Sequence, residues 1–411
     1  MRVTHQNWNA DRMESTSTPS AGENIAVLRK ARDWTQARLA RQIGVTVSYL
    51  SKIEVGLRPA TPPIVAACAK ALHVSTARIY GQPFLAPGEQ LDLLEDLRGA
   101  VRRYRLPRHD VPSPEELAGT LAKLADLRTA TRYIEMLRML PRALDEATAT
   151  AIEAGGDATA WSQLADAYGC AYAVAHRLGQ PDLAEMIVAR QAWASQQTWN
   201  PEADAATAWN EAGTYQSAGD YADGLAIVDR AIVRFESGHL TGDAGPEWLV
   251  PLGSLHLRGV VLASRAKDKA ATEAHARHAV ELARRLDSPK DVLRHNLTFG
   301  AGNTVLYQLA ANVELGDPDK ADELATPLLG NPPAGLTPNR VGRLYIDTAR
   351  ARLAMGRLSG AEEALSAAFA VAPQMAEVHP MAREVLRVLF VMHQRSKPEL
   401  LAMAKRSGLS V

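Results

Sequence analysis

Residues 35 to 56 of this chain read TQARLARQIGVTVSYLSKIEVG. The apolar side chains of this stretch recur at helical spacing and are Leu39, Ile43, Val45, Leu50 and Ile53. Gly44 stands where the first run ends, and glycine tolerates the left-handed backbone conformation that a tight turn requires. The stretch therefore predicts two short helices joined by a glycine turn.

Two threonines mark the expected starts of these helices. Thr35 precedes the first helix and Thr46 the second, and each hydroxyl can accept a backbone N–H of the first turn. The outward positions of the second helix carry short, neutral or basic side chains, which are Val47, Ser48, Tyr49, Ser51 and Lys52. Such a surface suits close approach to base edges and phosphates, so the second helix is a candidate DNA reader.

The helical pattern continues on both sides of this stretch. Ile25 and Leu28 predict one helix before it, while Ile64 and Leu72 predict another after it and Ile79 a short fifth. Five such helices would form a small compact domain. A helical hairpin without a DNA-binding role is the alternative that this pattern alone leaves open.

Charge is distributed unevenly along the chain. From Asn24 to Tyr80 there are nine Lys and Arg residues and two acidic residues, a balance of 9 − 2 = +7. The whole chain has 46 basic and 46 acidic residues, so the remainder carries −7. A basic module on an otherwise acidic chain indicates a polyanionic partner such as double-stranded DNA.

The same residues resemble the Cro/CI-type helix-turn-helix family, also called XRE. The resemblance rests on Thr35-Gln36, Leu39-Ala40, Gly44-Val45-Thr46, the run from Ser48 to Glu54, Gly56 and Arg58-Pro59. It implies a five-helix, lambda-repressor-like domain whose second motif helix enters the major groove. Specific DNA would then be recognised by a dimer, because one such domain reads only a half-site.

The resemblance also assigns roles to individual residues. Positions that match the base-reading positions are Val47, Ser48 and Lys52, with Thr46, Tyr49 and Ser51 beside them; positions that match phosphate contacts are Gln36 and Arg58. Family members often have glutamine where this chain has Val47. Valine cannot pair with adenine, but it can pack on a thymine methyl group, so the operator cannot be copied from better-known relatives. Lys52 contacting phosphate, and Tyr49 packing inside the domain, remain alternatives.

The composition along the chain predicts four segments. We expect a disordered arm at residues 1–22, the helix-turn-helix domain at 23–82, a solvated linker at 83–115 and a helical repeat domain at 116–411. The linker contains a short helix that ends in the basic cluster Arg102, Arg103, Arg105 and Arg108. Extra phosphate contact by this cluster is the alternative to a purely solvated role.

The repeat domain reads as helical throughout, with regular punctuation. The segments around Trp209 and Leu344 resemble tetratricopeptide (TPR) repeats, and helical hairpins are expected to turn at Gly179, Gly219, Lys267, Gly316 and Gly356. Successive turns are 40, 48, 49 and 40 residues apart, longer than the usual repeat of about 34. The pattern therefore predicts a degenerate α-solenoid of five or six helix pairs.

Stacked helix pairs leave a concave surface that binds a peptide, a small molecule or a protein. The candidate ligand contacts on first helices are Tyr172, His176, Asn210, Asn303, Tyr307 and Arg343. Asparagines such as Asn210 and Asn303 could hold a peptide backbone through two hydrogen bonds. The alternative for each residue is ordinary packing between helices.

No enzyme signature accompanies these features. The chain has neither a GxxxxGK[ST] phosphate loop nor a GxGxxG motif after a strand, and we assign no catalytic residue and no cofactor. His275 and His278 are three residues apart but lack further ligands, so a solvated face is expected in place of a metal site. Cys68 and Cys170 lie in apolar helical surroundings, which is typical of buried thiols in a cytoplasmic protein. No run of eighteen apolar residues predicts a membrane span.

Together these features predict an all-α transcriptional regulator, active as a homodimer, with DNA at one end and a signal-binding repeat domain behind it. Peptide-sensing regulators of Gram-positive bacteria share this domain order, and the high Ala, Arg and Gly content is typical of an actinobacterial source. A ligand that prefers one shape of the scaffold would shift the population and change half-site spacing. The alternative is a protein-interaction scaffold in which the helix-turn-helix is a docking module.

Overall fold

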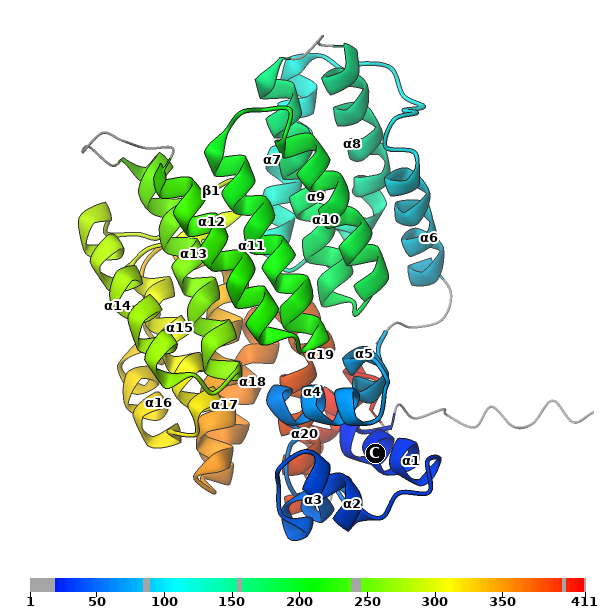
Figure 1. The fold of residues 1–411 in the computed structure, drawn as a ribbon, viewed down its shortest axis with the longest axis vertical. Helices are drawn as coiled ribbons and strands as arrows, with labels where there is room; N and C mark the ends of the chain where they lie inside the picture. The colour runs from blue at the N-terminus through cyan, green and yellow to red at the C-terminus, as the bar shows by residue number, and fades with distance from the viewer. Residues whose placement is uncertain (1–18, 84–88, 154–156, 238–244, 394–396, 410–411) are drawn as a thin grey trace, which may run out of the picture.

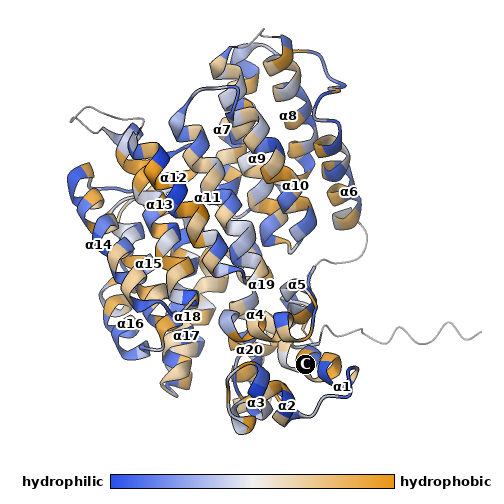
Figure 2. Cartoon of the chain, viewed as in Figure 1, coloured by the Kyte–Doolittle hydropathy of each residue, from blue (hydrophilic) through white to orange (hydrophobic). Residues whose placement is uncertain are grey.

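A computed structural model describes residues 19–83, 89–153, 157–237, 245–393 and 397–409. Within these residues the fold is all-α apart from one short β-hairpin, which confirms the predicted fold class. A small N-terminal helical domain lies against one end of a much larger array of helical hairpins (Figure 1). In Figure 2 hydrophobic and hydrophilic residues alternate along most helices, as expected of elements that bury one face.

The N-terminal domain consists of five helices. They are α1 (Ala21–Lys30), α2 (Gln36–Gln42), α3 (Val47–Glu54), α4 (Pro62–Ala71) and α5 (Thr76–Tyr80). The turn between α2 and α3 has the expected geometry, with φ +70° at Gly44. Both helices have the expected caps: the Thr35 hydroxyl accepts the Arg38 N–H at 3.1 Å before α2, and the Thr46 hydroxyl accepts the Tyr49 N–H at 3.2 Å before α3. Leu39, Leu50 and Ile53 are buried in the core of this domain. Local signals in the sequence therefore predicted this domain correctly.

Helix α1 begins inside the segment that we expected to be a disordered arm. Ser20 caps the helix, because its hydroxyl accepts the Glu23 N–H and the Glu23 carboxylate accepts the Ser20 N–H. The predicted arm, residues 1–22, therefore extended too far, because the cap and first residues of α1 lie within it. Residues 1–18 of the predicted arm lie outside the described residues.

Five helical hairpins follow one another from residue 158 to residue 371. Their helices are α9 (Ala158–Arg177), α10 (Pro181–Ser195), α11 (Pro201–Ala218), α12 (Tyr221–Ser237), α13 (Pro246–Arg265), α14 (Lys269–Leu286), α15 (Ala301–Leu315), α16 (Pro318–Ala325), α17 (Pro338–Ala354) and α18 (Leu358–Val371). Each predicted turn residue has a left-handed backbone, with φ between +63° at Lys267 and +92° at Gly219 and Gly316. The predicted hairpin turns are thus all present.

The segment that we expected to be a solvated linker contains a packed helix. Helix α6 (Glu89–Arg102) buries Leu94, Leu97 and Val101, and it contacts α8 (Tyr133–Glu153). The spacing of these apolar residues gives α6 one buried face, which the proline-rich flanks had obscured in the sequence. Arg103 of the basic cluster faces Asp145 at 3.4 Å, and Arg105 lies over Tyr104, so part of the cluster is engaged within the protein.

A β-hairpin interrupts the helices, contrary to the expectation of helix throughout. Strands β1 (Val292–Arg294) and β2 (Leu297–Phe299) pair antiparallel between α14 and α15. The two turn residues, His295 and Asn296, both have positive φ, as a tight two-residue hairpin requires. Asn296 donates to the Asp166 carbonyl at 3.0 Å, so the hairpin is fastened to α9.

The two ends of the helical array share one core. Buried side chains of α6 to α10, with α7 at Pro114–Thr129, form a single cluster with those of α17, α18, α19 (Pro373–Val378), α20 (Pro380–Met392) and α21 (Pro398–Arg406). The Gln374 amide oxygen of α19 accepts the Ile134 N–H of α8 at 3.4 Å. The array therefore curves until its two ends meet, and its inner face surrounds a central space.

The N-terminal domain contacts this array through α1, α4, α5 and the segment between α3 and α4. Helices α2 and α3 lie at the end of the domain away from α11 (Figure 1). The Thr76 hydroxyl of α5 donates to the Ser217 carbonyl of α11 at 2.5 Å. The Glu384 carboxylate of α20 accepts the Ala60 N–H at 3.0 Å and the Ala21 N–H at 3.4 Å. Among the described helices, none is both long and apolar enough to cross a membrane.

Candidate nucleic-acid interface and ligand cavity

A buried ion pair holds the two motif helices together. The Arg29 guanidinium of α1 donates two hydrogen bonds to the Glu54 carboxylate at the end of α3, at 2.7 and 2.8 Å. The Gln36 amide, at the start of α2, donates to the same carboxylate at 2.8 Å. Both charged side chains are more than nine-tenths buried. This network fixes α2 and α3 relative to α1, so the outer face of α3 is rigidly presented.

The environment of Glu54 favours its ionised form. Burial alone would raise the pKa of this carboxyl, but the hydrogen bonds from Arg29 and Gln36 and the charge of Arg29 outweigh it, and the pKa lies below its ordinary value. Gln36 was predicted to touch phosphate and to brace the reading helix. Its amide is engaged in bracing, and its side chain remains partly exposed.

The predicted base-reading residues share one exposed face. Thr46, Val47, Ser48 and Lys52 are exposed, and Val47 keeps 45% of its surface accessible despite being apolar. Tyr49 and Ser51 are half-buried at the sides of this face. The Arg58 guanidinium, which is exposed, lies 5.5 Å from the centre of the Tyr49 ring. The structure thus brings these predicted DNA-contact residues together, and two of them, Lys52 and Arg58, are basic.

The six predicted ligand contacts also come together. Tyr172, His176, Asn210, Asn303, Tyr307 and Arg343 all line one cavity of about 130 Å³ inside the array, which we call the inner cavity. They come from α9, α11, α15 and α17, which are far apart in the sequence. The Tyr172 and His176 rings are stacked, with centroids 5.4 Å apart. The curvature of the array therefore places these first-helix residues around a common space.

The two asparagines are not free to hold a peptide backbone in the manner expected. The Asn210 amide donates to the Gln191 side chain at 2.8 Å, and the Asn303 amide donates to the Thr298 carbonyl at 2.7 Å. The Asn210 nitrogen is therefore engaged with α10 and the Asn303 nitrogen with strand β2, and a two-point clamp would first have to break these bonds. The Asn303 oxygen, in contrast, is buried without a hydrogen-bond partner.

Sequence reasoning missed four arginines of the inner cavity. Arg128 of α7, Arg177 of α9, Arg258 of α13 and Arg340 of α17 line it together with the predicted Arg343. Arginines on helices normally indicate solvent-exposed faces, so their spacing in the sequence did not predict that they line a cavity. One signal was present at Arg258, because its neighbours Leu255, Leu257 and Val260 are apolar on all sides of the helix, and a helix that is hydrophobic all round is buried.

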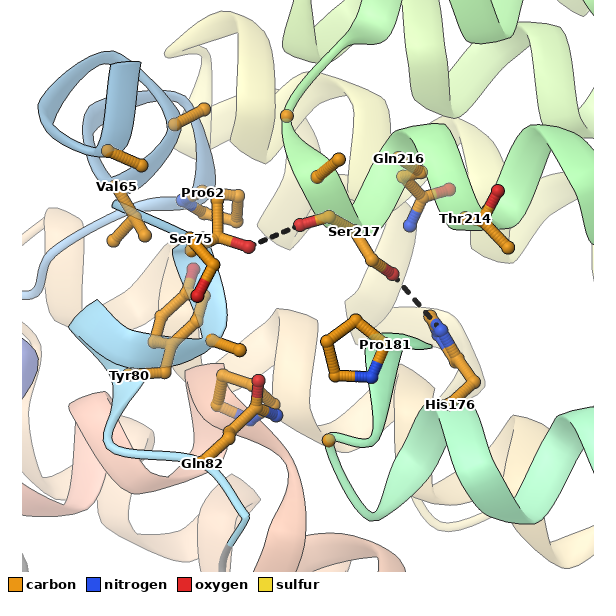
Figure 3. A pocket seen from close by; sticks show the side chains of 18 of the residues that line it. Pro62, Val65, Ser75, Tyr80, Gln82, His176, Pro181, Thr214, Gln216 and Ser217 are labelled. Carbon is orange, nitrogen blue, oxygen red and sulfur yellow. Dashed lines mark hydrogen bonds between the residues drawn. The ribbon is translucent and has the colours of Figure 1, made fainter. Parts of the chain in front are cut away.

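A second, larger space lies between the N-terminal domain and the array. This interdomain cavity has a volume of about 730 Å³ and is lined on one side by residues such as Val65 and Tyr80. Figure 3 shows these side chains facing His176 and Ser217 of the array. His176, Arg177, Gln216 and Arg343 line both cavities. The inner cavity and the interdomain cavity therefore adjoin each other at these four residues.

The histidine pair on α14 differs from expectation in one respect. His278 is exposed, as predicted, but His275 is largely buried against His256 of α13, with the two Nδ1 atoms 3.0 Å apart. Burial, with the neighbouring histidines, lowers the pKa of His256 to about 3. Gly259 permits this contact, because a side chain there would overlap the His275 ring. His256 and His275 therefore serve as packed, neutral side chains, whereas His278 lies on the solvated face that was expected.

Both cysteines are buried free thiols, as predicted. Burial raises the pKa of Cys68 to about 12 and that of Cys170 to about 11. Neither thiol is therefore ionised at neutral pH, and nucleophilic chemistry needs the thiolate.

Comparison with known proteins identifies the N-terminal domain. Residues 25–79 match the helix-turn-helix family, so the chain carries a helix-turn-helix domain there. No curated protein matches the chain. Among solved structures, Bacillus thuringiensis PlcR in complex with the peptide PapR7 and DNA is 16% identical, with 65% of this chain and 95% of that chain covered and a TM-score of 0.23. A mutant of PrgX is 9% identical, with 94% and 100% covered and a TM-score of 0.28. At these TM-scores neither likeness carries an inference for this chain.

Proposed function

We propose that this protein is a sequence-specific DNA-binding transcriptional regulator whose helical array binds a signal ligand. The observation that carries the proposal is the placement of α3. Its Val47, Ser48 and Lys52 side chains are exposed, and α3 belongs to a basic helix-turn-helix domain in which it lies at the end away from α11 (Figure 1). A duplex could therefore approach α3 while the domain stays docked.

The geometry supports separate roles for the exposed residues. Ser48 and Lys52 are one helical turn apart, so both can reach base edges from the same groove, and Val47 offers a methyl contact to thymine. Arg58, beyond the end of α3, is placed to contact a phosphate and to position the domain without reading sequence. Two copies of the protein would bind two half-sites, since a single α3 reads only a few base pairs.

A continuous series of contacts supports coupling between ligand and DNA domain. The Thr76 hydroxyl of α5 donates to the Ser217 carbonyl, and the Ser217 hydroxyl lies 3.1 Å from Nδ1 of His176 (Figure 3). His176 in turn stacks on Tyr172 in the inner cavity. A ligand that moves Tyr172 or His176 would favour one arrangement of the docked domain over another, which is how a population shift would reach the operator.

The proposal is tested by measuring the affinity of the full-length protein for genomic DNA fragments as a function of salt concentration. We expect log K to fall linearly with log salt, with selected fragments binding at least about 1000-fold tighter than random duplex. Chromatin immunoprecipitation with sequencing then supplies the operator. Absence of affinity for every genomic fragment at low salt would show that the domain docks proteins instead.

A further inference from the structure

The inner cavity has an unusual charge balance. Its lining contains five arginines, Arg128, Arg177, Arg258, Arg340 and Arg343, and among the described residues no aspartate or glutamate lines it. Arginine stays protonated in proteins. Arg128 and Arg258 retain only 8% and 6% of their surface, so solvent screens these charges weakly.

Three carboxylates outside the lining have partners of their own, and one of them, Asp347, already pairs with the lining residue Arg343. Asp347 pairs with Arg343 at 2.7 Å and with Arg350 at 2.8 Å. Asp291 accepts the backbone N–H groups of Gly302 and Asn303 at 3.1 and 2.8 Å, and Asp166 lies 3.2 Å from His295. These contacts balance at most part of the positive charge around the cavity.

Several polar atoms of the lining lack partners. Nε and Nη2 of Arg128, Nε of Arg258, Nε of Arg340 and the Tyr172 hydroxyl are buried without a hydrogen bond. A buried donor left unsatisfied is unfavourable, and a buried unpaired charge more so. Arg258 is held in place by other contacts, since it donates to Gln216 at 2.6 Å and lies over the Trp209 ring at 3.6 Å.

The effect of this potential is visible at Tyr307. Burial alone would raise the pKa of its hydroxyl, yet the nearby Arg340 and Arg258 outweigh burial and the pKa lies below its ordinary value. The Tyr307 oxygen accepts a hydrogen bond from Arg340 at 3.4 Å. The charges around Tyr307 thus outweigh its burial, whereas at Tyr172 of the same lining burial outweighs Arg258 and Arg177, and the pKa lies above its ordinary value.

We propose that the inner cavity is an anion-binding subsite, in which Arg128, Arg258 and Arg340 bind a carboxylate or phosphate group of the signal ligand. The inference rests on the proposed ligand-binding role of the array. Guanidinium groups bind both kinds of anion through paired N–H donors. The cavity is too small for a whole drug-sized ligand, which needs roughly 300 Å³ or more. The rest of the ligand would therefore extend toward the interdomain cavity, past the shared His176 and Arg177.

The Asn303 oxygen adds a second feature to the expected ligand. It is an unpaired acceptor in a lining otherwise dominated by donors, so it selects a group that donates an N–H or O–H close to the anion. An anion with a neighbouring donor would satisfy both the arginines and Asn303.

The test uses the full-length protein with sodium phosphate and sodium citrate as probes, against sodium chloride at matched ionic strength. We expect one probe or both to raise the Tm by a few degrees and to saturate at millimolar concentration. Arg128→Met and Arg258→Met should each abolish the saturable rise. Arg258→Met also loses the hydrogen bond to Gln216, so it is judged by the probe response alone. Arg128→Met should also raise the Tm of the protein without probe, because it removes a buried charge without breaking an ion pair. A purely structural arginine would instead lower it.

Arg350→Met is the matched control. Arg350 is equally buried but pairs with Asp347 and Glu314 at 2.8 and 2.9 Å, so its loss should lower the Tm and leave the probe response intact. If Arg350→Met does not fold, Arg406→Met on the surface replaces it. A response to phosphate alone or to citrate alone identifies the anion type.

The proposal is overturned if neither probe exceeds chloride, or if both methionine variants respond as the wild type does, since phosphate and citrate also stabilise proteins by exclusion from the surface. DNA affinity measured on the same samples separates the two proposals. Retained DNA binding without an anion response overturns only the subsite, whereas an anion response without DNA binding overturns only the regulator.

Discussion

The Glu384 carboxylate in α20 accepts the backbone N–H of Ala60, which is 324 residues away in sequence, at 3.0 Å. Its other oxygen accepts the N–H of Ala21, at the start of α1. The Glu384 side chain also pairs with Arg387 at 3.2 Å and is almost fully buried. One carboxylate near the C-terminus thus binds the DNA-binding domain at two points.

Replacing Glu384 with alanine should loosen this docking. Two backbone donors would lose their acceptor, and Arg387 would lose its ion pair with Glu384. We therefore expect the free energy of unfolding to fall by about 1–3 kcal/mol. Hydrogen exchange should accelerate at the Ala60 amide and in α1, measured by mass spectrometry. Glu377→Ala is the control, because Glu377 forms only a surface pair with Arg406 and its loss should cost less than about 1 kcal/mol. Equal exchange in both variants would contradict the role assigned to Glu384.

A second contact can be probed at a glycine. Gly219 has φ +92°, and a Cβ added there would lie 2.5 Å from the Ala66 Cβ of α4. Gly219→Ala should therefore separate the DNA-binding domain from α11, seen as faster limited proteolysis between the two. Gly316 has the same φ and the same place in a hairpin turn, with nothing within 4 Å. Gly316→Ala thus reports the backbone strain alone.

A double-variant cycle isolates the clash itself. Adding Ala66→Gly to Gly219→Ala removes the opposing methyl group. The double variant should therefore lose less stability than the sum of the losses in the two single variants. If Gly219→Ala and Gly316→Ala lose the same stability and the cycle shows no coupling, the two surfaces are not in contact in solution.

The stability of the helix-turn-helix domain should depend on pH through Glu54. The folded-state pKa of Glu54 lies below its unfolded value, so its contribution is complete above the ordinary glutamate range of roughly 4–5 and is lost as the pH falls through the folded-state pKa. Glu54→Ala should lower the free energy of unfolding by about 3–5 kcal/mol at neutral pH, because Arg29 would remain buried and unpaired.

The double variant Arg29→Met with Glu54→Leu should recover much of that loss and should unfold with a weaker pH dependence in the acid range. Urea unfolding monitored by circular dichroism at several pH values measures both effects. If the free energy of unfolding depends on pH in the same way in the wild type and in the double variant, Glu54 is not the group that causes the dependence.

Variants of the exposed face should separate sequence reading from positioning. Ser48→Ala and Lys52→Ala should weaken binding to the operator more than to random DNA, by about 1–3 kcal/mol for a lost base contact. Arg58→Ala should weaken both alike and reduce the salt slope by about 1. Fluorescence anisotropy with labelled duplexes gives all three values.

Arg277→Ala supplies the control for charge, since Arg277 is an exposed arginine on α14 of the array. It should leave DNA affinity unchanged. The reverse pattern, with Arg58 specific and Lys52 unspecific, would exchange the proposed roles of these residues.

The prediction from sequence succeeded where a few neighbouring residues decide the conformation. Gly44 and Thr46 set the turn and the start of α3 through contacts that span no more than three residues. The hairpin turns at Gly219 and Gly316 followed from the same local chemistry. The error at α6 and the missed β-hairpin have the opposite cause, since each is stabilised by contact with distant helices, α8 and α9.

The sequence by itself therefore determined the two helical parts of this protein and the residues of α3 that face outward, because periodicity and capping act within a helix. Only the tertiary structure decided how the ends of the array meet, where Glu384 holds the DNA-binding domain, and which arginines surround the inner cavity. Arg128 and Arg340 lie more than two hundred residues apart in the chain. Their meeting depends on the accumulated curvature of many hairpins, which no local pattern contains.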